Sequence, residues 1–248
     1  MGDLLELTAR AEPSHFWFRG FRNHLAPVIH GIAAGRRNLR IIDCGCGTGY
    51  NLMNLLHPYG QTFAFDRTVD ALRRARTARR PLVRADIQQI PFASNSFDLA
   101  TSFDVIQSVP DDTQALRELA RIIKPGGHLV LNVTALDVLD GDHSDVWGEF
   151  RRYTAQRAER LLKGAGLEPV RVTYLFGSLV PLMLAVRWVQ KVLRPIRPPD
   201  GDADLTIPPP PINTMLTLLV SGEAALARRQ VWLPFGSSLL IVAKKPRD

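Results

Sequence analysis

A short glycine-rich segment, residues 43–49, constrains the fold of this chain more than any other feature. It stands between residues 39–44, which are apolar enough to form a buried strand, and residues 52–56, whose apolar positions have helical spacing. Glycines at such a junction let the backbone turn sharply and come close to a ligand. Open α/β sheets bind ligands at the carboxyl ends of their strands, so we expect a binding site at this turn.

Strands and helices alternate along the central part of the chain. After the glycine-rich turn, helices are expected at residues 69–79, 111–123 and 154–163. Strands are expected at residues 39–44, 62–66, 82–86, 97–103, 128–133, 167–174 and 238–244. Alternation of this kind implies parallel βαβ units. The sequence therefore predicts an α/β fold with a doubly wound, Rossmann-like, mostly parallel seven-stranded sheet and a helical cap or insert.

The composition excludes several classes of protein. Hydrophobic residues make up 46% and charged residues 22%, which is the balance of an ordinary globular protein and excludes a disordered chain or a fibrous repeat. Cys44 and Cys46 would share one face of a strand, so we expect them to pack rather than to bridge, and no metal site is predicted. The net charge of +7 suits nucleic acid, anionic lipid or acidic substrates equally.

The residues around the glycine-rich turn discriminate between two nucleotide cofactors. A dinucleotide fingerprint carries glycine or alanine three residues after its second glycine, but here Tyr50 follows Gly47 at that spacing and Gly49 comes too early. Asp43 precedes the turn, where a carboxylate is a poor neighbour for a pyrophosphate and a good one for an ammonium or sulfonium group. Asp66 ends the second strand, where an acid accepts both hydroxyls of a ribose. The turn therefore favours a cationic nucleoside over NAD.

Several motifs follow one another in an order that resembles one family. They are Asp43-x-Gly45-x-Gly47-Thr48-Gly49, Asp66, Asp86-Ile87, Phe97-Asp98 and Lys124-Pro125-Gly126-Gly127. This order and spacing resemble the class I S-adenosylmethionine-dependent methyltransferases, most of all the branch that contains the ubiquinone and menaquinone methyltransferases. The resemblance covers about residues 39–133 and implies S-adenosyl-L-methionine as the cofactor.

The resemblance implies a set of cofactor-binding residues within this core. They are Asp43, Gly45, Cys46, Gly47, Thr48, Gly49, Asp66, Arg67, Asp86, Ile87, Phe103 and Asp104. The turn would pass under the methionine portion, with Asp43 near its amino group and Asp66 on the ribose hydroxyls. Asp86 would accept from the adenine amino group, with Ile87 covering the ring and Arg67 flanking it. Phe103 and Asp104 would lie near the methionine end.

The catalytic base is less well marked than the cofactor site. Methyl transfer from a sulfonium has a neutral leaving group, so a base is needed only when the acceptor must lose a proton early. Family members often carry an acid and a histidine after the fourth strand, where this chain has Gln107-Ser108. We therefore consider His143, Glu149 and Tyr153, and predict His143 and Tyr153 as catalytic. His143 ranks first, because histidine ordinarily titrates near neutral pH. A surface histidine is the plainer alternative at position 143.

The aromatic run at residues 15–19 begins a helix, for which Ser14 is the expected N-cap. Two interpretations of this helix stay open. It would be a core element of a capping region, or a lid over the cofactor in which Arg19 or Arg22 meets the cofactor carboxylate. We include Trp17 and Arg19 among the predicted cofactor-binding residues.

Residues 175–193 are strongly apolar, but only residues 175–186 are free of charge, which is too short for a membrane span. The segment would be a core helix of a substrate cap, or an interfacial helix with its basic residues toward anionic head groups. Both interpretations favour an apolar or lipid-like acceptor, because this insert would line the acceptor pocket.

We expect one methyltransferase-type domain over residues 1–248. Its parts would be an N-terminal capping region (1–38), a cofactor-binding core (39–133), a substrate cap or insert (134–230) and a final strand region (231–248). Its function would be methyl transfer from S-adenosyl-L-methionine to a small, hydrophobic or lipid-like acceptor.

Two alternatives to this function stay open. A nucleic-acid methyltransferase is disfavoured because Ser102-Phe103-Asp104-Val105 stands where base-methylating enzymes carry Asn/Asp-Pro-Pro-Tyr/Phe. A non-catalytic cofactor-binding partner protein is kept open by Gln107-Ser108. With no apolar secretory segment near residue 1, a cytoplasmic location is expected, with peripheral membrane contact as an open alternative.

Overall fold

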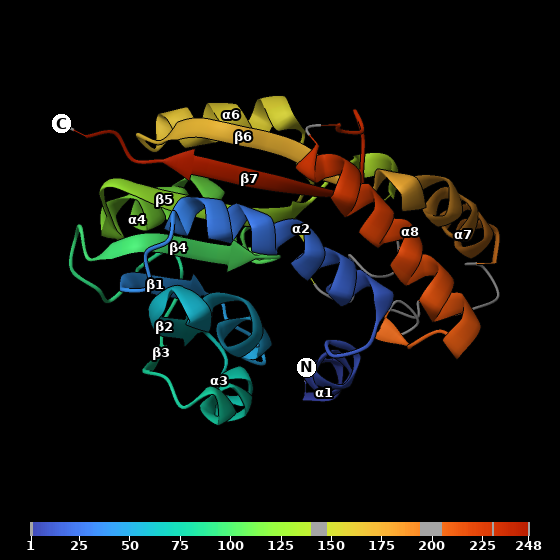
Figure 1. The fold of residues 1–248 in the computed structure, drawn as a ribbon, viewed down its shortest axis with the longest axis horizontal. Coiled ribbons are helices and arrows are strands. Elements are labelled where there is room, and N and C mark those ends of the chain that lie inside the picture. Colours follow the sequence, from blue (N-terminus) through green and yellow to red (C-terminus); the bar gives the residue numbers. More distant parts are fainter. Residues whose placement is uncertain (1, 140–147, 194–204, 230, 248) are drawn as a thin grey trace.

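A seven-stranded sheet runs through the protein (Figure 1). The computed structural model describes residues 2–139, 148–193, 205–229 and 231–247. The strands are β1 (Leu39–Cys44), β2 (Gly60–Asp66), β3 (Leu82–Arg84), β4 (Phe97–Phe103), β5 (Ile123–Thr134), β6 (Glu168–Leu175) and β7 (Ser238–Lys244). Their order is β3-β2-β1-β4-β5-β7-β6, with β1 to β5 in parallel and β7 antiparallel to both of its neighbours. This confirms the predicted mostly parallel sheet.

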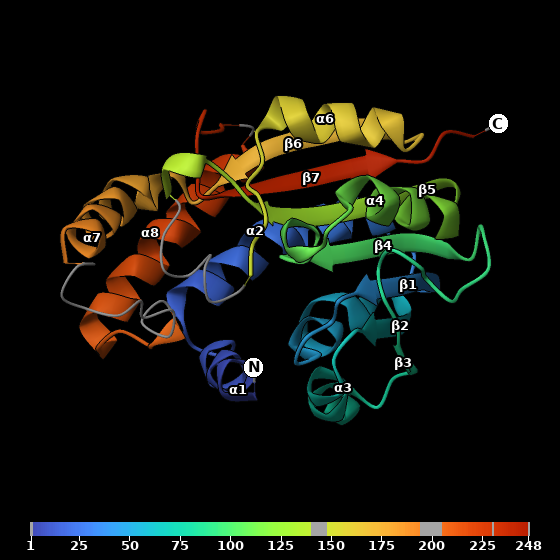
Figure 2. The ribbon, with the colours of Figure 1, turned by 180° about the vertical axis from the view of Figure 1, so that it is seen from behind.

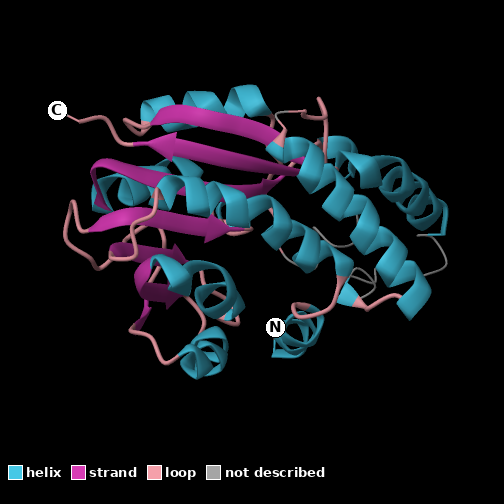
Figure 3. Cartoon of the chain, viewed as in Figure 1, coloured by secondary structure: helices cyan, strands magenta, loops and turns pink. Residues whose placement is uncertain are grey.

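Helices cover both faces of the sheet, as Figure 3 shows in its colouring by secondary structure. They are α1 (Gly2–Ala11), α2 (Phe16–Ala33), α3 (Val69–Ala75), α4 (Asp112–Ile122), α6 (Ala155–Gly164), α7 (Val180–Leu193) and α8 (Pro210–Arg228). Apolar side chains of α4 and α6 pack in one core with Ile42, and those of α2 and α8 pack in a second core with Ile41. Successive side chains of a strand point to opposite faces, so β1 contributes to both cores. Figure 2 shows α4 on the face opposite α2.

Helices α2 and α8 pack along each other although they are far apart in the sequence. A Cβ at Gly20 would lie 2.6 Å from Cγ2 of Val220, so only glycine allows this approach. The Phe16 N–H donates to Oδ1 of Asn213 at 2.9 Å, and the Asn213 amide donates to the Ser14 carbonyl at 3.0 Å. The start of the chain is therefore anchored to a helix from its last quarter.

The start of α2 differs from the expectation by one residue. Its N-cap is His15, whose Nδ1 accepts from the Trp17 N–H at 3.2 Å. Ser14, the predicted N-cap, instead donates its N–H to the Ala11 carbonyl at 3.1 Å. This bond closes the end of α1, a helix that the periodicity analysis did not predict, and so moves the next cap by one position.

Exposed apolar side chains are frequent on both α7 and α8, and we call them together the α7/α8 apolar surface. Its most exposed members are Leu182 (51%), Trp188 (68%) and Val192 (56%) of α7 and Met215 (61%) and Leu218 (69%) of α8. Both helices lie at the same end of the molecule, beyond the sheet, in Figures 1 and 2. Within the described ranges, no helix is long and apolar enough to cross a membrane.

Candidate functional site

The glycine-rich turn lies at the carboxyl end of β1, where the chain order of the sheet reverses between β1 and β4. The N–H groups of Gly45 and Cys46 donate to the Phe65 carbonyl of β2 at 2.9 and 3.0 Å, and the Gly49 N–H donates to the Cys46 carbonyl at 2.9 Å. These bonds hold residues 45–49 against the ends of β1 and β2. The predicted turn is therefore placed where open α/β sheets bind ligands.

The three glycines of the turn have different surroundings. All have positive φ: +82° at Gly45, +53° at Gly47 and +80° at Gly49. A Cβ at Gly45 would lie 2.5 Å from Cγ2 of Val105, and one at Gly49 would lie 2.9 Å from Cα of Ala75. A Cβ at Gly47 would meet nothing within 4 Å. Close packing therefore requires glycine at Gly45 and Gly49, whereas an added Cβ at Gly47 would face open space.

Asp66, the last residue of β2, directs its carboxylate at this turn. Oδ2 accepts the Gly47 N–H at 3.1 Å, and Oδ1 accepts the N–H and the hydroxyl of Thr68 at 2.8 and 3.0 Å. Each carboxylate oxygen has about two acceptor positions, so Oδ2 retains capacity for another donor. A half-buried carboxylate of this kind beside open space suits the hydroxyls of a ribose.

Asp43 is a buried acid within β1. Its side chain is 2% exposed, and Oδ1 accepts the hydroxyl of Thr101 at 2.7 Å. Burial raises the pKa of Asp43 to about 7, the negative charge of Asp66 raises it further, and the Thr101 bond acts in the opposite direction. The carboxyl therefore titrates near neutral pH and would be stabilised in its charged form by a nearby cation.

Glu12, which the sequence interpretation missed, also reaches the turn. It is 8% exposed, and its carboxylate accepts a hydrogen bond from the Thr48 hydroxyl. Burial raises the pKa of Glu12 to about 7, against the effects of Thr48 and Arg22 and with that of Asp43. In the sequence, only its place three residues before the aromatic run marks Glu12, and that spacing does not connect it to the turn.

The predicted adenine-side residues follow the ends of the next two strands. Arg67 comes directly after β2 and is exposed, and its carbonyl accepts from Nε of Arg84 at 3.1 Å. Asp86 and Ile87 come just after β3. The Asp86 carboxylate accepts the Gln88 N–H at 2.8 Å, and Ile87 is buried in the core. The structure thus brings these residues to the same edge of the sheet as the turn.

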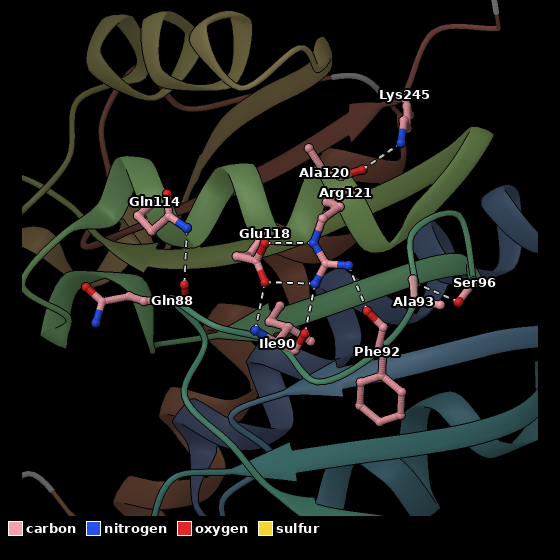
Figure 4. A network of polar contacts seen from close by, with 10 residues as sticks. All are labelled: Gln88, Ile90, Phe92, Ala93, Ser96, Gln114, Glu118, Ala120, Arg121 and Lys245. Carbon is pink, nitrogen blue, oxygen red and sulfur yellow. Dashed lines mark hydrogen bonds and ion pairs between the residues drawn. The ribbon is translucent and has the colours of Figure 1, made fainter.

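A polar network on α4 fixes the loop after Ile87 (Figure 4). Glu118 accepts the Ile90 N–H at 2.8 Å, and Arg121 donates to the carbonyls of Ile90 and Phe92 at 2.8 and 2.7 Å. Glu118 and Arg121 also form an ion pair at 2.7 Å. The loop that follows the predicted adenine-side residues is therefore held by side chains of α4.

The end of β4 carries a second titratable group. The backbone of Asp104 has φ +56°. Residues other than glycine rarely adopt this conformation, and those that do are often found at functional sites. Its Oδ1 accepts the Asn132 amide at 2.8 Å, and the Gln107 amide also hydrogen-bonds to it. Burial raises the pKa of Asp104 to about 7, and the charge of Glu149 adds to this. Protein atoms surround the carboxylate closely, although part of the residue is exposed to solvent.

Trp17 of α2 packs against the residue that follows β6. Trp17 stacks on Phe176, with ring centroids 4.0 Å apart and planes at 23°. Arg19 is exposed, whereas Arg22 is half-buried and reaches the turn, where its guanidinium lies 4.6 Å from the centroid of the Tyr50 ring. Of the two arginines considered for the cofactor carboxylate, Arg22 is the one whose contacts lie at the turn.

Of the two predicted catalytic residues, the structure describes only Tyr153. His143 lies outside the described residues and stays a prediction. Tyr153 is 3% exposed, and its hydroxyl donates to Oδ2 of Asp112 at 2.9 Å. Burial and the Asp112 charge raise the pKa of the Tyr153 phenol. These contacts join the insert to α4, and a catalytic role for Tyr153 stays a prediction.

Comparison with known proteins identifies the family. The methyltransferase domain family matches residues 42–131. Malonyl-(acyl-carrier protein) O-methyltransferase of Pseudescherichia vulneris is 31% identical over 177 residues, which cover 66% of this chain and 70% of that protein. The chain belongs to the class I S-adenosylmethionine-dependent methyltransferases. The family resemblance and the cofactor, S-adenosyl-L-methionine, are thereby confirmed.

Two further proteins that this chain resembles show how far the similarity extends. Demethylmenaquinone methyltransferase of Corynebacterium kroppenstedtii is 34% identical over 92 residues, which cover 37% of this chain and 40% of that protein. Phosphoethanolamine N-methyltransferase 2 of Haemonchus contortus, solved in complex with S-adenosyl-L-methionine, matches at a TM-score of 0.60 with 17% identity over 89% of this chain and 52% of that one. The chain spans about half the length of several curated relatives that it matches. The structural likeness supports the fold.

Proposed function

We propose that this methyltransferase transfers a methyl group from S-adenosyl-L-methionine to a small, hydrophobic or lipid-like acceptor. One observation carries the proposal: Gly47 faces open space, and the carboxyls of Asp43 and Asp66 flank the turn to which it belongs. This arrangement suits a ligand with both a ribose and a positive charge. When bound, the cofactor supplies a methyl group on a positively charged sulfur, which is activated for in-line transfer.

We assign the cofactor-binding roles by position in the site. Asp66 accepts the ribose hydroxyls, and Asp86 accepts from the adenine amino group. Ile87 covers the adenine ring and Arg67 flanks it. Asp43 lies near the amino group of the methionine portion, where a cation favours its charged form.

The remaining cofactor residues surround the methionine portion. The backbone of the turn from Gly45 to Gly49, including Cys46 and Thr48, passes beneath it. Phe103 closes one side, where its ring meets Phe21 of α2 edge-on at 5.2 Å. Trp17 and Arg19 belong to the helix that covers the site, and this cover excludes water from the reacting groups.

On the acceptor side we propose Asp104 as the base where the acceptor must lose a proton. Buried amides of Asn132 and Gln107 hold its carboxylate, and each is 1% exposed. With a pKa of about 7, the group is about half ionised at neutral pH, which suits a general base. Asp104 lies three residues before Gln107, at the strand end where family members often carry their acid and histidine.

The α7/α8 apolar surface supports a hydrophobic acceptor. Single exposed apolar side chains are ordinary, but a group spread over two helices indicates contact with a ligand, a partner or a membrane. The named relatives act on demethylmenaquinone and on malonyl-(acyl-carrier protein), so their names do not agree on an acceptor. Since the protein has a net charge of +7, we propose that the surface meets anionic lipid. Sedimentation with phosphatidylglycerol vesicles but not with phosphatidylcholine vesicles is expected, and Trp188→Glu should weaken it.

Calorimetric titration with S-adenosylmethionine, S-adenosylhomocysteine and NADH tests the cofactor assignment. We expect both adenosyl compounds to bind and NADH not to bind. Asp66→Asn should weaken S-adenosylhomocysteine binding by about tenfold or more, because hydrogen bonds to a charged group contribute about 1.5–3 kcal/mol. The matched variant Asp98→Asn, at the opposite end of the sheet, should leave the affinity unchanged. Equal affinities in the two variants would contradict the ribose assignment.

A methyl-transfer screen with quinone, phenol and isoprenoid compounds then addresses the acceptor. Transfer of labelled methyl to one of these compounds supports the proposal. A non-catalytic partner protein would bind the cofactor and convert none of them. A nucleic-acid methyltransferase would instead bind RNA or DNA with an affinity that falls steeply with salt.

A further inference from the structure

The N-terminal segment, defined as residues 2–15, connects the cofactor turn with the cap. Near its end, the Glu12 carboxylate accepts a hydrogen bond from the Thr48 hydroxyl. Within α1, Glu6 forms an ion pair with Arg74 of α3, and the two helices are in contact. On its other side, the Ser14 carbonyl accepts from α8, as described above. In Figures 1 and 2, α1 lies below α2, on the side of the molecule where α3 is drawn. The segment therefore crosses the site edge and is held at both ends.

The Glu12 carboxylate is buried with a hydroxyl as its hydrogen-bond donor. Arg22, the cation that faces it, donates to the backbone carbonyl of Glu12 and places its guanidinium over the ring of Tyr50. Among the residues that the structure describes, the Glu12 carboxylate forms no ion pair. A buried carboxylate is costly in its charged form unless a cation accompanies it. The site is therefore complementary to a positive charge that arrives with a ligand.

Asp43 of β1 is a second buried carboxyl close enough for its charge to act on Glu12. It too is buried with a single hydroxyl donor, Thr101, and its negative charge contributes to the raised pKa of Glu12. Over the described ranges, no group of three His, Cys, Asp or Glu side chains could hold a metal ion. Two buried carboxyls around a turn with open space at Gly47 thus suit a compact organic cation.

We propose that Glu12 receives the α-ammonium group of the cofactor's methionine portion, opposite Asp43, and that this contact holds the N-terminal segment closed over the glycine-rich turn. The inference rests on the proposed function, since it requires the cofactor at the turn. Thr48 keeps the Glu12 carboxylate in place through its hydroxyl.

A consequence of this arrangement is that cofactor binding releases protons. Burial is the main cause of the raised pKa of both carboxyls. The hydrogen bonds from Thr48 to Glu12 and from Thr101 to Asp43 lower these pKa values, as the charge of Arg22 does for Glu12. The charge of Asp43 raises the pKa of Glu12, and that of Asp66 raises the pKa of Asp43. With both pKa values at about 7, each carboxyl is about half protonated at pH 7, so the arriving ammonium displaces about half a proton from each.

Calorimetry on the full chain tests the assignment of Glu12. The titrants are S-adenosylhomocysteine, which carries the ammonium group, and 5′-methylthioadenosine, which lacks it, each at pH 7 in buffers of different ionisation enthalpy. We expect Glu12→Gln to weaken S-adenosylhomocysteine about tenfold or more and to reduce proton release by about half, with methylthioadenosine affinity unchanged. Glu6→Gln, a matched change in α1, should behave as the wild type in both measures.

Hydrogen exchange provides a second readout that does not depend on a variant. In the wild type, S-adenosylhomocysteine should slow exchange of the amides of residues 4–12, and methylthioadenosine should not. Equal protection by both compounds, or by neither, would overturn the proposal, as would an equal loss of affinity for both compounds in Glu12→Gln. Failure of the wild type to bind either compound would instead refute the proposed function.

Discussion

Replacing Gly47 by alanine separates the folding role of the glycine-rich turn from its binding role. Gly47 has φ +53°, and an added Cβ would meet nothing within 4 Å. A non-glycine residue in this left-handed conformation costs about 1–2 kcal/mol. The melting temperature should therefore fall by about 2–8 °C for a domain of this size. The new methyl group would also enter the space assigned to the cofactor, so S-adenosylhomocysteine affinity should fall about tenfold or more, which is about 1.4 kcal/mol.

Gly35→Ala is the matched control for this prediction. Gly35 has φ +81°, also has nothing within 4 Å of an added Cβ, and precedes β1 at the amino end of the sheet. It should lose a similar amount of stability in urea denaturation and keep the wild-type affinity in calorimetry. Wild-type affinity in Gly47→Ala, with the expected loss of stability, would refute the placement of the cofactor over this turn.

Three further predictions concern packing and pH. Tyr153→Phe removes the hydrogen bond to Asp112 and should cost about 1 kcal/mol in denaturation without changing cofactor affinity, whereas a large loss of affinity would indicate a binding role. Gly20→Ala forces a Cβ to within 2.6 Å of Val220 Cγ2 and should cost about 1–3 kcal/mol; an unchanged melting temperature would show that α2 and α8 separate freely. Folding raises the pKa of Glu12 to about 7, so its stabilising effect is full below about pH 4.5 and is lost as the pH rises toward 7. The wild type should therefore lose more unfolding free energy between pH 5 and pH 7 than Glu12→Gln, and parallel curves would contradict the buried, protonated carboxyl.

Local sequence patterns were sufficient to predict the strands around the glycine-rich turn, the turn itself and the acid at the end of β2. Residues 39–44 and 97–103 form the strands expected of them, and Asp66 ends β2 beside the turn. These features could be predicted because the apolar pattern of a buried strand and the spacing of the glycines can be recognised within about ten consecutive residues. The N-cap of α2 was wrong by one residue because α1 ends immediately before it, and its closing bond uses the Ser14 N–H.

The contacts that complete the site could not be predicted in the same way. Asp104 was expected only near the methionine end, and its position between the amides of Gln107 and Asn132 depends on how β4 and β5 are aligned. Tyr153 has the chemistry of a base, but folding buries it against Asp112. In both cases the side chain's protonation follows from its neighbours in space.

By itself, the sequence determined the α/β class, the turn at the end of β1 and the kind of cofactor, because these follow from periodicity and from residue types at fixed spacing. Only the tertiary structure decided that Glu12 meets Thr48 across 36 residues and that α8 covers α2. Those contacts are set by the packing of helices on the two faces of the sheet, where separation along the chain carries no information about distance. The charge state of the buried acids follows in turn, since desolvation exists only once the chain has closed around them.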